Sequence, residues 1–217
     1  MLDITSIVVG PLWVNSYLVW DRATGDGILV DPGDEGERLI ETIRSSGVKI
    51  KSIIITHGHF DHIKDAGYVS SALKAPVLAH KDEVPLIEHV AEQAVMFGLP
   101  PVKPPRIAGY LNDGDVVSVS SYSFEVHSTP GHSPGSITLY SRSEGVAFVG
   151  DLIFHESVGR TDLPGGDDDT LLASIRRHIL SLPDSTKLLA GHGEPTTVAH
   201  ERAYNPFLAE MYRDEAR

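Results

Sequence analysis

The segment from residue 53 to residue 62 joins an uninterrupted apolar run to a dense group of metal-binding side chains. Ile53-Ile54-Ile55 is typical of a buried strand, and it leads directly into Thr56-His57-Gly58-His59-Phe60-Asp61-His62. Alternate residues of an extended chain point in opposite directions, so these side chains converge only if the backbone curls after the strand. Imidazole and carboxylate groups suit zinc, iron and manganese. The segment therefore predicts a buried strand that ends at a metal site, with Gly58 easing the curl; a solvated polar loop is the alternative.

Three further candidates share one setting along the chain. His132, Asp151 and His192 each follow a predicted strand and lie beside glycine residues. Each could be an ordinary turn histidine or capping aspartate when taken alone. Loops at the ends of strands are, however, where sheet proteins commonly place functional side chains. Together with the histidine-rich segment, the three residues predict one shared site.

The rest of the chain alternates strand and helix patterns. Asp34 with Glu37 predicts a capping box for a helix that ends at Gly47, and the run 167–169 predicts N-terminal capping of the helix that extends to Leu182. The proline-dense stretch 98–105 predicts an irregular connection. Strands are expected over Ile4–Val9, Asn15–Trp20, Gly27–Val30, Lys51–Thr56, Ala75–Ala79, Gly145–Val149 and Lys187–Ala190, with several more between residues 116 and 140. This order favours an α/β sandwich, and the length of 217 residues suits a single domain over 1–217.

Composition narrows the chemistry and the partners. The chain has no cysteine, so histidine and carboxylate groups must supply any metal site, and a β-lactamase with a cysteine ligand is excluded. A net charge of −12 argues against a nucleic-acid partner or an anionic membrane surface, although bound metal ions could still attract an anionic substrate. The N-terminus lacks the pattern of a secretory signal, and no apolar run is long enough to span a membrane. We therefore expect a cytoplasmic protein.

With these motifs in place, nearly the whole chain resembles the metallo-β-lactamase superfamily. The resemblance implies a four-layer αββα sandwich with metal ions at one edge. It implies His57, His59 and His132 as ligands of one metal and Asp61, His62 and His192 as ligands of a second, with Asp151 bridging both. Asp31, in Asp31-Pro32-Gly33, is expected to support the ligands from behind, because metal-binding histidines need partners on their other ring nitrogen.

Within that superfamily the chain is most similar to glyoxalase-II-like hydrolases of a short bacterial type. The stretches that carry this likeness are Asn15-Ser16-Tyr17-Leu18, the run from Val158 to Asp167, and Asn205-Pro206-Phe207-Leu208. Only about 25 residues follow His192, too few for the C-terminal helical domain that helps full-length glyoxalase II bind glutathione. The likeness implies hydrolysis of a small-molecule thioester such as S-lactoylglutathione by a metal-bridging hydroxide. Asp151 and Asp61 would be catalytic, and the two divalent ions would be zinc, with iron or manganese as alternatives.

Arg160 and Phe154 are the candidates for substrate contact. Arg160 could pair with a substrate carboxylate or with Asp162 in its own loop. Three other functions compete with the thioesterase: an iron persulfide dioxygenase, which shares the stretch 159–162; another hydrolase of the superfamily, such as a lactonase; and a non-catalytic metal-binding protein. The sequence leaves open whether the protein is a monomer or a small homo-oligomer.

Overall fold

A computed structural model describes residues 1–209; residues 210–217 of the expected domain lie outside the described part. Two sheets of six strands each form the centre of the fold. The first sheet has the order β1 (Leu2–Val9), β2 (Val14–Asp21), β3 (Asp26–Val30), β4 (Lys49–Ile54), β5 (Val77–Ala79), β6 (Ile107–Tyr110). The second has the order β14 (Thr196–Thr197), β13 (Lys187–Ala190), β10 (Val146–Gly150), β9 (Ile137–Ser141), β8 (Tyr122–Ser128), β7 (Val116–Val119).

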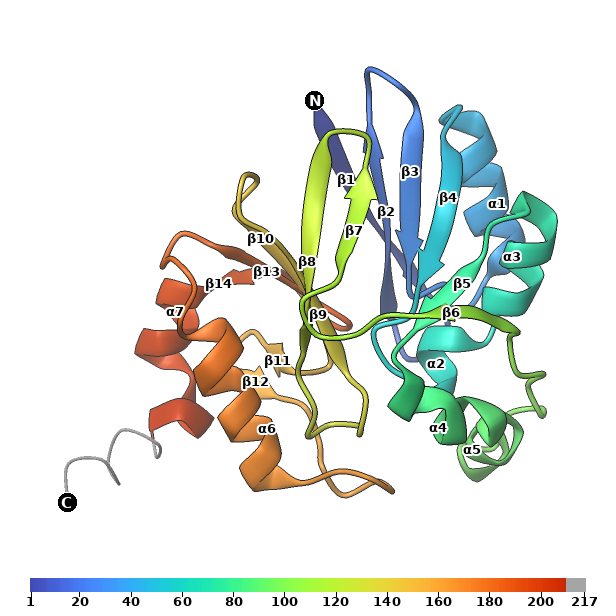
Figure 1. Cartoon of the computed structure of the whole chain (residues 1–217). Helices are drawn as coiled ribbons and strands as arrows, with labels where there is room; N and C mark the ends of the chain where they lie inside the picture. Colours follow the sequence, from blue (N-terminus) through green and yellow to red (C-terminus); the bar gives the residue numbers. More distant parts are fainter. Residues whose placement is uncertain (210–217) are drawn as a thin grey trace.

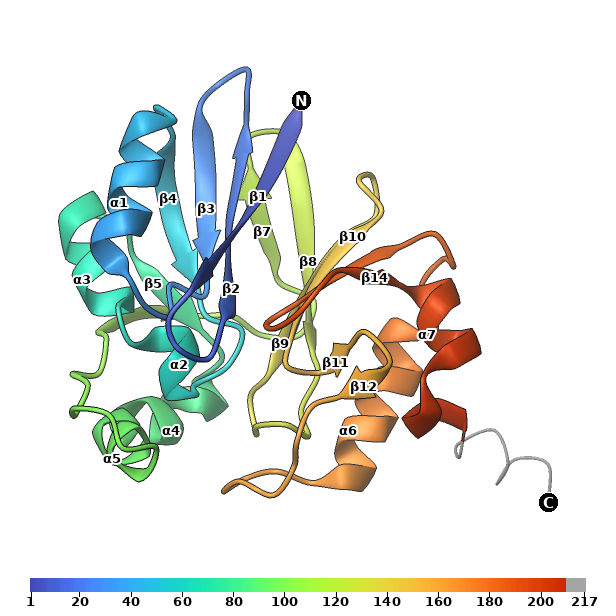
Figure 2. The same cartoon turned by 180° about the vertical axis from the view of Figure 1, so that it is seen from behind.

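Helices cover the outer faces of both sheets, and Figures 1 and 2 show the layers from opposite sides. On the side of the first sheet are α1 (Gly36–Ser45), α2 (Phe60–Ile63), α3 (Ala66–Leu73), the 3-10 turn η1 (Lys81–Glu83), α4 (Val84–Glu88) and α5 (Val90–Met96). On the side of the second are α6 (Asp168–Ser174), the π-helical segment η2 (Ile175–Ile179) and α7 (Val198–Tyr204). A small hairpin of β11 (Ile153–Phe154) and β12 (Ser157–Val158) lies between β10 and α6 in sequence.

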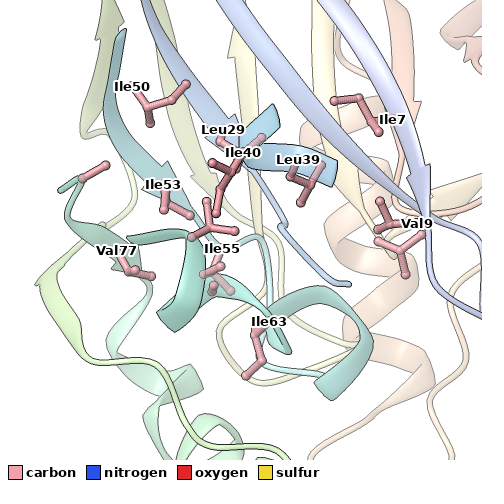
Figure 3. Packing of buried hydrophobic residues seen from close by; sticks show 14 of the residues in the cluster. Ile7, Val9, Leu29, Leu39, Ile40, Ile50, Ile53, Ile55, Ile63 and Val77 are labelled. Carbon is pink, nitrogen blue, oxygen red and sulfur yellow. The ribbon is translucent and has the colours of Figure 1, made fainter. Parts of the chain in front are cut away.

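Three apolar clusters match the three interfaces of four layers. One packs the first sheet against its helices, and Figure 3 shows side chains such as Leu39, Ile53 and Ile63 in it. A second joins the two sheets, with Ile28 from one and Phe148 from the other. The third packs the second sheet against α6, η2 and α7. Each sheet therefore buries both faces, which explains why β2 and β10 are almost entirely buried and confirms the αββα expectation.

Parallel pairing brings distant loops to one edge of the sandwich. Strand β4 runs parallel to β3 and β5, and β10 runs parallel to β13. The loops that follow β4, β10 and β13 begin at residues 55, 151 and 191. An isolated bridge between Val14 and His192 ties the two sheets together at this edge. The histidine-rich segment, Asp151 and His192 therefore meet although they are far apart in sequence.

Several local expectations are confirmed and one is wrong. The stretch 98–105 is irregular, and Asp167 caps α6 by accepting a hydrogen bond from the Thr170 N–H at 2.8 Å. The capping box at Asp34 does not form. Helix α1 begins at Gly36, whose N–H instead donates to Asp65 Oδ2 at 2.6 Å. A carboxylate from the start of α3 therefore satisfies this helix end, a contact that local sequence cannot reveal. No helix in residues 1–209 is long and apolar enough to span a membrane.

Candidate metal centre

The seven predicted residues converge at the ends of three strands and one loop. His57 and His59 follow β4, and helix α2 then begins at Phe60, which places Asp61 and His62 in its short first turn. Asp151 follows β10, His192 follows β13, and His132 lies in the loop between β8 and β9. The structure thus brings together every residue that the sequence assigned to the site. A Cβ at Gly58 would lie 2.8 Å from Glu83 Oε2, so the close approach of Glu83 favours glycine at this position; its role in the curl stays a prediction.

Three histidines form what we call the inner set: His57, His59 and His132. All three are buried, and their facing nitrogens lie within 4.8 Å of one another. His59 Nδ1 is 2.8 Å from His132 Nε2. Three imidazoles packed edge to face with their nitrogens inward form a site that a cation could occupy.

Asp61, His62 and His192 form the outer set. His192 Nε2 lies 3.3 Å from Asp61 Oδ2 and 3.4 Å from His62 Nε2. The side chains of Asp61 and His192 are 15% and 27% exposed, whereas that of His62 is fully buried. This group therefore faces solvent more than the inner set does.

Asp151 lies between the two sets. Its Oδ2 is 3.7 Å from His132 Nε2 and 4.0 Å from His57 Nε2 on one side, and 3.4 Å from His192 Nε2 on the other. Its Oδ1 is 3.4 Å from His62 Nε2. One carboxylate thus reaches nitrogens of both sets, which is the position that a bridging ligand requires.

Partners on the outward ring nitrogens fix the orientation of the histidines. His62 Nδ1 donates to Asp31 Oδ2 at 2.9 Å. The Thr56 hydroxyl also donates to Asp31 Oδ2, at 2.6 Å, and can therefore accept from His57 Nδ1 at 3.1 Å. Asp31 thus orients one histidine of each set, although its backbone carries a positive φ of 49° that is uncommon outside glycine. This places Asp31 behind the site, where it was expected.

The outward nitrogens of His132 and His192 bond to main-chain carbonyls. His132 Nδ1 donates to the Arg160 carbonyl at 2.7 Å, and His192 Nδ1 donates to the Leu12 carbonyl at 2.9 Å. A carbonyl only accepts, so these bonds place a proton on Nδ1 in both rings. Nε2 of each ring therefore faces Asp151 and is the nitrogen that can bind a metal ion once it carries no proton.

The pKa values of the two sets move in opposite directions. Burial lowers the pKa of His57 well below its ordinary value, lowers that of His132, and lowers that of His59 to about 4. Burial also acts to lower the pKa of His62 and His192, but the neighbouring carboxylates Asp151 and Asp61 outweigh it. The pKa of His62 is raised, and that of His192 is raised to about 9. Without metal, the histidines of the inner set are neutral at pH 7 and those of the outer set are positively charged.

Carboxylates of the site remain ionised at neutral pH. Burial alone would raise the pKa of Asp151 and of Asp61. The positive charge of His62 and the hydrogen bond from His192 outweigh burial in each case. The pKa of Asp151 falls well below its ordinary value, and that of Asp61 is also lowered. Both side chains therefore present anionic oxygens to the centre.

Unpartnered polar atoms test whether the residues fit a metal. Among the described residues, four buried polar side-chain atoms have no hydrogen-bond partner, and three of them belong to the site: His57 Nε2, His59 Nε2 and Asp151 Oδ1. Such atoms are costly unless something binds them. Tetrahedral ligands at zinc–nitrogen distances of about 2.0–2.1 Å lie roughly 3.3 Å apart. The outer-set separations of 3.3 to 3.4 Å around His192 are close to that spacing, so the donor set fits divalent metal ions.

Comparison with known proteins gives the same result as the geometry. Residues 9–192 match the Metallo-beta-lactamase superfamily, which is most of the chain. The chain belongs to this superfamily. Membership supports an enzyme of the metallo-hydrolase type that binds divalent metal. One relative is "Hydroxyacylglutathione hydrolase GloC" of Haemophilus influenzae, 37% identical over 95% of this chain and 98% of its own. Another is "Probable metallo-hydrolase YqgX" of Bacillus subtilis, 36% identical over 92% and 94%.

Solved structures of the superfamily superpose closely on this chain. The B3 metallo-beta-lactamase BLEG-1 gives a TM-score of 0.89 at 36% identity and covers 95% of this chain and 99% of its own. TTHA1623 in a di-iron-bound form gives 0.85 at 38% identity, with 94% and 99% covered. ETHE1 from Myxococcus xanthus gives 0.78 at 25% identity, with 94% and 83% covered. The fold is shared by proteins with differently described functions, so the fold alone does not choose the substrate.

A pocket of about 410 Å³ opens onto the centre of this superfamily member. Its lining includes His59, Asp61, His132, Asp151 and His192, and it also includes both predicted contact residues, Phe154 and Arg160. Arg160 forms a two-pronged ion pair with Asp162, Nε to Oδ1 at 2.6 Å and Nη2 to Oδ2 at 2.7 Å. The salt bridge within the loop is therefore present, and Arg160 also lines the pocket. His155 lies beside Phe154 in sequence but contacts Glu194 instead of lining the pocket.

One supporting residue, Glu83, was not predicted from the sequence. Glu83 is buried, and its carboxylate accepts bonds from the N–H groups of Gly58 and Gly135 and from the Ser133 hydroxyl at 2.7 Å. Burial raises its pKa. Glu83 thus clamps the His57–His62 loop to the loop that carries His132. Nothing near Glu83 in sequence indicates this role, because its partners are 25 to 52 residues away.

The amide of Asn15 supports the loop that carries His192. Its Nδ2 donates to the carbonyls of Ala190 at 3.0 Å and Gly193 at 2.9 Å. Between them, Gly191 has no room for a side chain, because a Cβ would lie 2.1 Å from Asp151 Oδ1. The stretch that begins at Asn15 was singled out in the sequence, and the structure supplies its physical role.

Proposed function

We propose that this protein is a binuclear metal-dependent thioester hydrolase of the hydroxyacylglutathione hydrolase type, which converts S-lactoylglutathione to lactate and glutathione. The observation that carries the proposal is the position of Asp151 between two complete sets of donors. The 37% identity to the GloC relative over nearly the whole chain supports the thioester substrate.

In this proposal the inner set holds one metal ion, the outer set holds the other, and Asp151 serves both. We propose zinc, with iron or manganese as alternatives, since histidine and carboxylate donors suit all three. When bound, the ions supply a water of lowered pKa and a Lewis acid for the carbonyl oxygen. The di-iron form of TTHA1623 supports iron as a candidate.

The protein's own residues supply orientation and exclude water. Asp61 is ionised and faces the pocket, so its carboxylate can accept a hydrogen bond from the attacking water. Aromatic side chains of Phe60, Phe97 and Phe154 line the pocket and keep bulk water from the thioester. A departing thiolate has an ordinary thiol pKa near 8.5, so it leaves without a strong acid.

Contacts to the substrate complete the proposal. Phe154, whose ring centroid lies 6.1 Å from that of His192, would pack against the substrate near the outer set. Arg160 would hold a substrate carboxylate while remaining paired with Asp162. We further propose a cytoplasmic monomer or small homo-oligomer that acts on a small molecule, without nucleic-acid or membrane partners; the net charge of −12 supports the last point.

One preparation can test the proposal. Metal content per chain and the release of thiol from S-lactoylglutathione are measured together. About two metal ions with turnover support the binuclear thioesterase. A single iron, no thioester turnover and oxygen uptake with glutathione persulfide would move the protein to the dioxygenase class.

Likeness to BLEG-1 adds a second candidate activity. BLEG-1 is described as a B3 metallo-beta-lactamase, and its fold superposes on this chain with a TM-score of 0.89. Nitrocefin therefore belongs in the same assay, beside a lactone. Turnover of nitrocefin or the lactone above that of the thioester would replace the thioesterase by another hydrolase of the superfamily.

A further inference from the structure

A second cavity continues from the metal centre along the protein surface. It has a volume of about 660 Å³ and shares His59, Gln93, Phe97 and Leu163 with the pocket over the metals. We call this cavity the side groove. Because His59 lines both spaces, a molecule that reacts at the centre can extend into the groove without leaving the protein surface.

The walls of the side groove are mainly apolar. One wall comes from α4 and the end of α5, with Pro85, Leu86, Met96 and Phe97. The opposite wall comes from two loops, with Pro134, Leu163 and Pro164. Met96 is 76% exposed and Phe97 is 46% exposed, although Phe97 also packs on Phe60 with ring centroids 5.0 Å apart. A contiguous exposed apolar surface beside a reactive centre is typical of a binding site.

Charges at the rim argue against an anionic occupant. Lys81 is the one Lys or Arg side chain among the described residues that line the side groove, and Asp82 and Glu92 line it too. Glutathione carries two carboxylates and one ammonium group, so a rim with more carboxylates than cations does not favour it. Of the two parts of a glutathione thioester, the acyl group therefore suits this groove better than the glutathione moiety does.

Lactate is too small to use such a space. The groove has room for roughly twenty water molecules, at about 30 Å³ each, and a three-carbon acyl group would leave most of that water in place. We infer that the physiological substrate is a thioester with a longer apolar acyl chain, which lies in the side groove. This inference rests on the proposed thioesterase function and names the class of its acyl group.

Rates on a series of thioesters provide the first test. S-Lactoyl-, S-butyryl-, S-hexanoyl- and S-octanoylglutathione are compared on the metal-loaded protein. A half-covered methylene should contribute roughly a twofold gain, so kcat/KM should rise by about tenfold or more from butyryl to octanoyl. Equal rates across the series with clear turnover of the lactoyl compound would overturn the inference and leave the proposed function intact. No turnover of any thioester would instead overturn the proposed function.

Binding of a non-hydrolysable ligand tests the groove without catalysis. Calorimetry should show S-octylglutathione, a thioether, binding about tenfold more tightly than S-butylglutathione. Met96→Glu should abolish both this gain and the gain in kcat/KM, while leaving turnover of S-lactoylglutathione unchanged. Val95→Glu is the matched control, because Val95 is on the same helix and 56% exposed but does not line the groove. Equal effects of the two variants would contradict the inference. A second outcome would also contradict the inference: the protein is a dimer, and Met96→Glu dissociates it without altering the dependence of kcat/KM on acyl-chain length. A second copy of the chain would then occupy the groove.

Discussion

The inner and outer sets differ although they share one carboxylate. His57, His59 and His132 are deeply buried, and burial keeps their rings neutral at pH 7. Asp61 and His192 face the pocket; against the effect of burial, the charge of His62 keeps the pKa of Asp61 low, and hydrogen bonds to Asp151 and Asp61 keep the pKa of His192 high. A metal ion can enter the inner set without displacing a proton, whereas entry into the outer set must release protons. Burial lowers the histidine pKa values of the inner set, whereas neighbouring carboxylates raise those of the outer set, so the histidines of the two sets differ in charge.

The largest effect is expected where the two sets meet. Asp151→Ala removes the carboxylate that reaches both, so metal content should fall below two ions per chain. Thioester turnover should fall by about a thousandfold or more, since metal catalysis supplies several kcal/mol. Elemental analysis and steady-state kinetics measure the two outcomes. Metal content of two ions per chain in this variant would show that Asp151 is not shared.

A smaller effect is expected when Glu83 is changed, and it should lower the metal affinity of the inner set more than that of the outer set. Glu83→Gln replaces an acceptor of two N–H bonds with a side chain that can accept at one oxygen only, so the loops of His57 and His132 lose their clamp. Metal affinity of the inner set should fall by roughly 10- to 100-fold, as for other residues that support ligands. Competition with a chelator measures this affinity.

The matched control for Glu83 is Glu88→Gln, which alters an exposed glutamate of α4. It should leave the affinity of both metals unchanged. A loss of outer-set affinity alone in Glu83→Gln would contradict the assignment of the clamp to the inner set.

Opposite pKa shifts predict different pH dependence for the two metals. In the metal-free protein His192 has a pKa of about 9 and is protonated at pH 7, so release of this proton alone should strengthen binding at the outer set by up to about tenfold from pH 7 to pH 8, and the raised pKa of His62 acts in the same direction. His59, with a pKa of about 4, is already neutral there, so inner-set affinity should stay nearly constant. Calorimetric titrations at both pH values measure the two affinities. Equal pH dependence of the two affinities would remove the distinction between the sets.

The same pKa shifts make the stability of the metal-free protein depend on pH, and the two sets contribute with opposite signs. A raised histidine pKa contributes stability that is present below about pH 6.5 and is lost as pH rises through about 9, which describes His192. A lowered histidine pKa has the opposite effect on stability. Because of His59, the folded protein becomes less stable as pH falls from about 6.5 towards 4. Histidine resonances followed by NMR should titrate in these two ranges; coincident titration would contradict the account.

The smallest effect concerns the relay behind His57. Thr56→Val removes the hydroxyl that links His57 Nδ1 to Asp31, which leaves a buried N–H without a partner. The unfolding free energy of the metal-free protein should fall by about 1–3 kcal/mol in urea titrations. Thr56→Ser keeps the hydroxyl and should cost less than half as much. Equal losses in the two variants would attribute the effect to packing.

Sequence reasoning succeeded where chemistry is concentrated in short segments. The His57–His62 motif follows an apolar strand, and His132, Asp151 and His192 each follow a strand beside glycine, so the gathering of these residues at the strand ends could be predicted. The alternation of strand and helix patterns predicted an α/β sandwich, and the resemblance to the metallo-β-lactamase superfamily implied its four-layer order. These signals are local, because a strand and the loop after it are adjacent in the chain.

Other features depended on contacts between distant segments. Asp65 caps α1 from 29 residues away, and Glu83 joins two loops that the sequence treats separately. The main-chain carbonyl of Arg160 holds His132, although the sequence directed attention to the Arg160 side chain. The side groove forms only when α5 and the loop around Leu163 are brought together. Such features arise from tertiary packing, which no local pattern encodes.

Anomalous diffraction from zinc-loaded crystals tests the central claim most directly. The account predicts two peaks about 3.5–4 Å apart, one among His57, His59 and His132 and one among Asp61, His62 and His192, with the Asp151 carboxylate contacting both. A single peak in the presence of excess metal would contradict it.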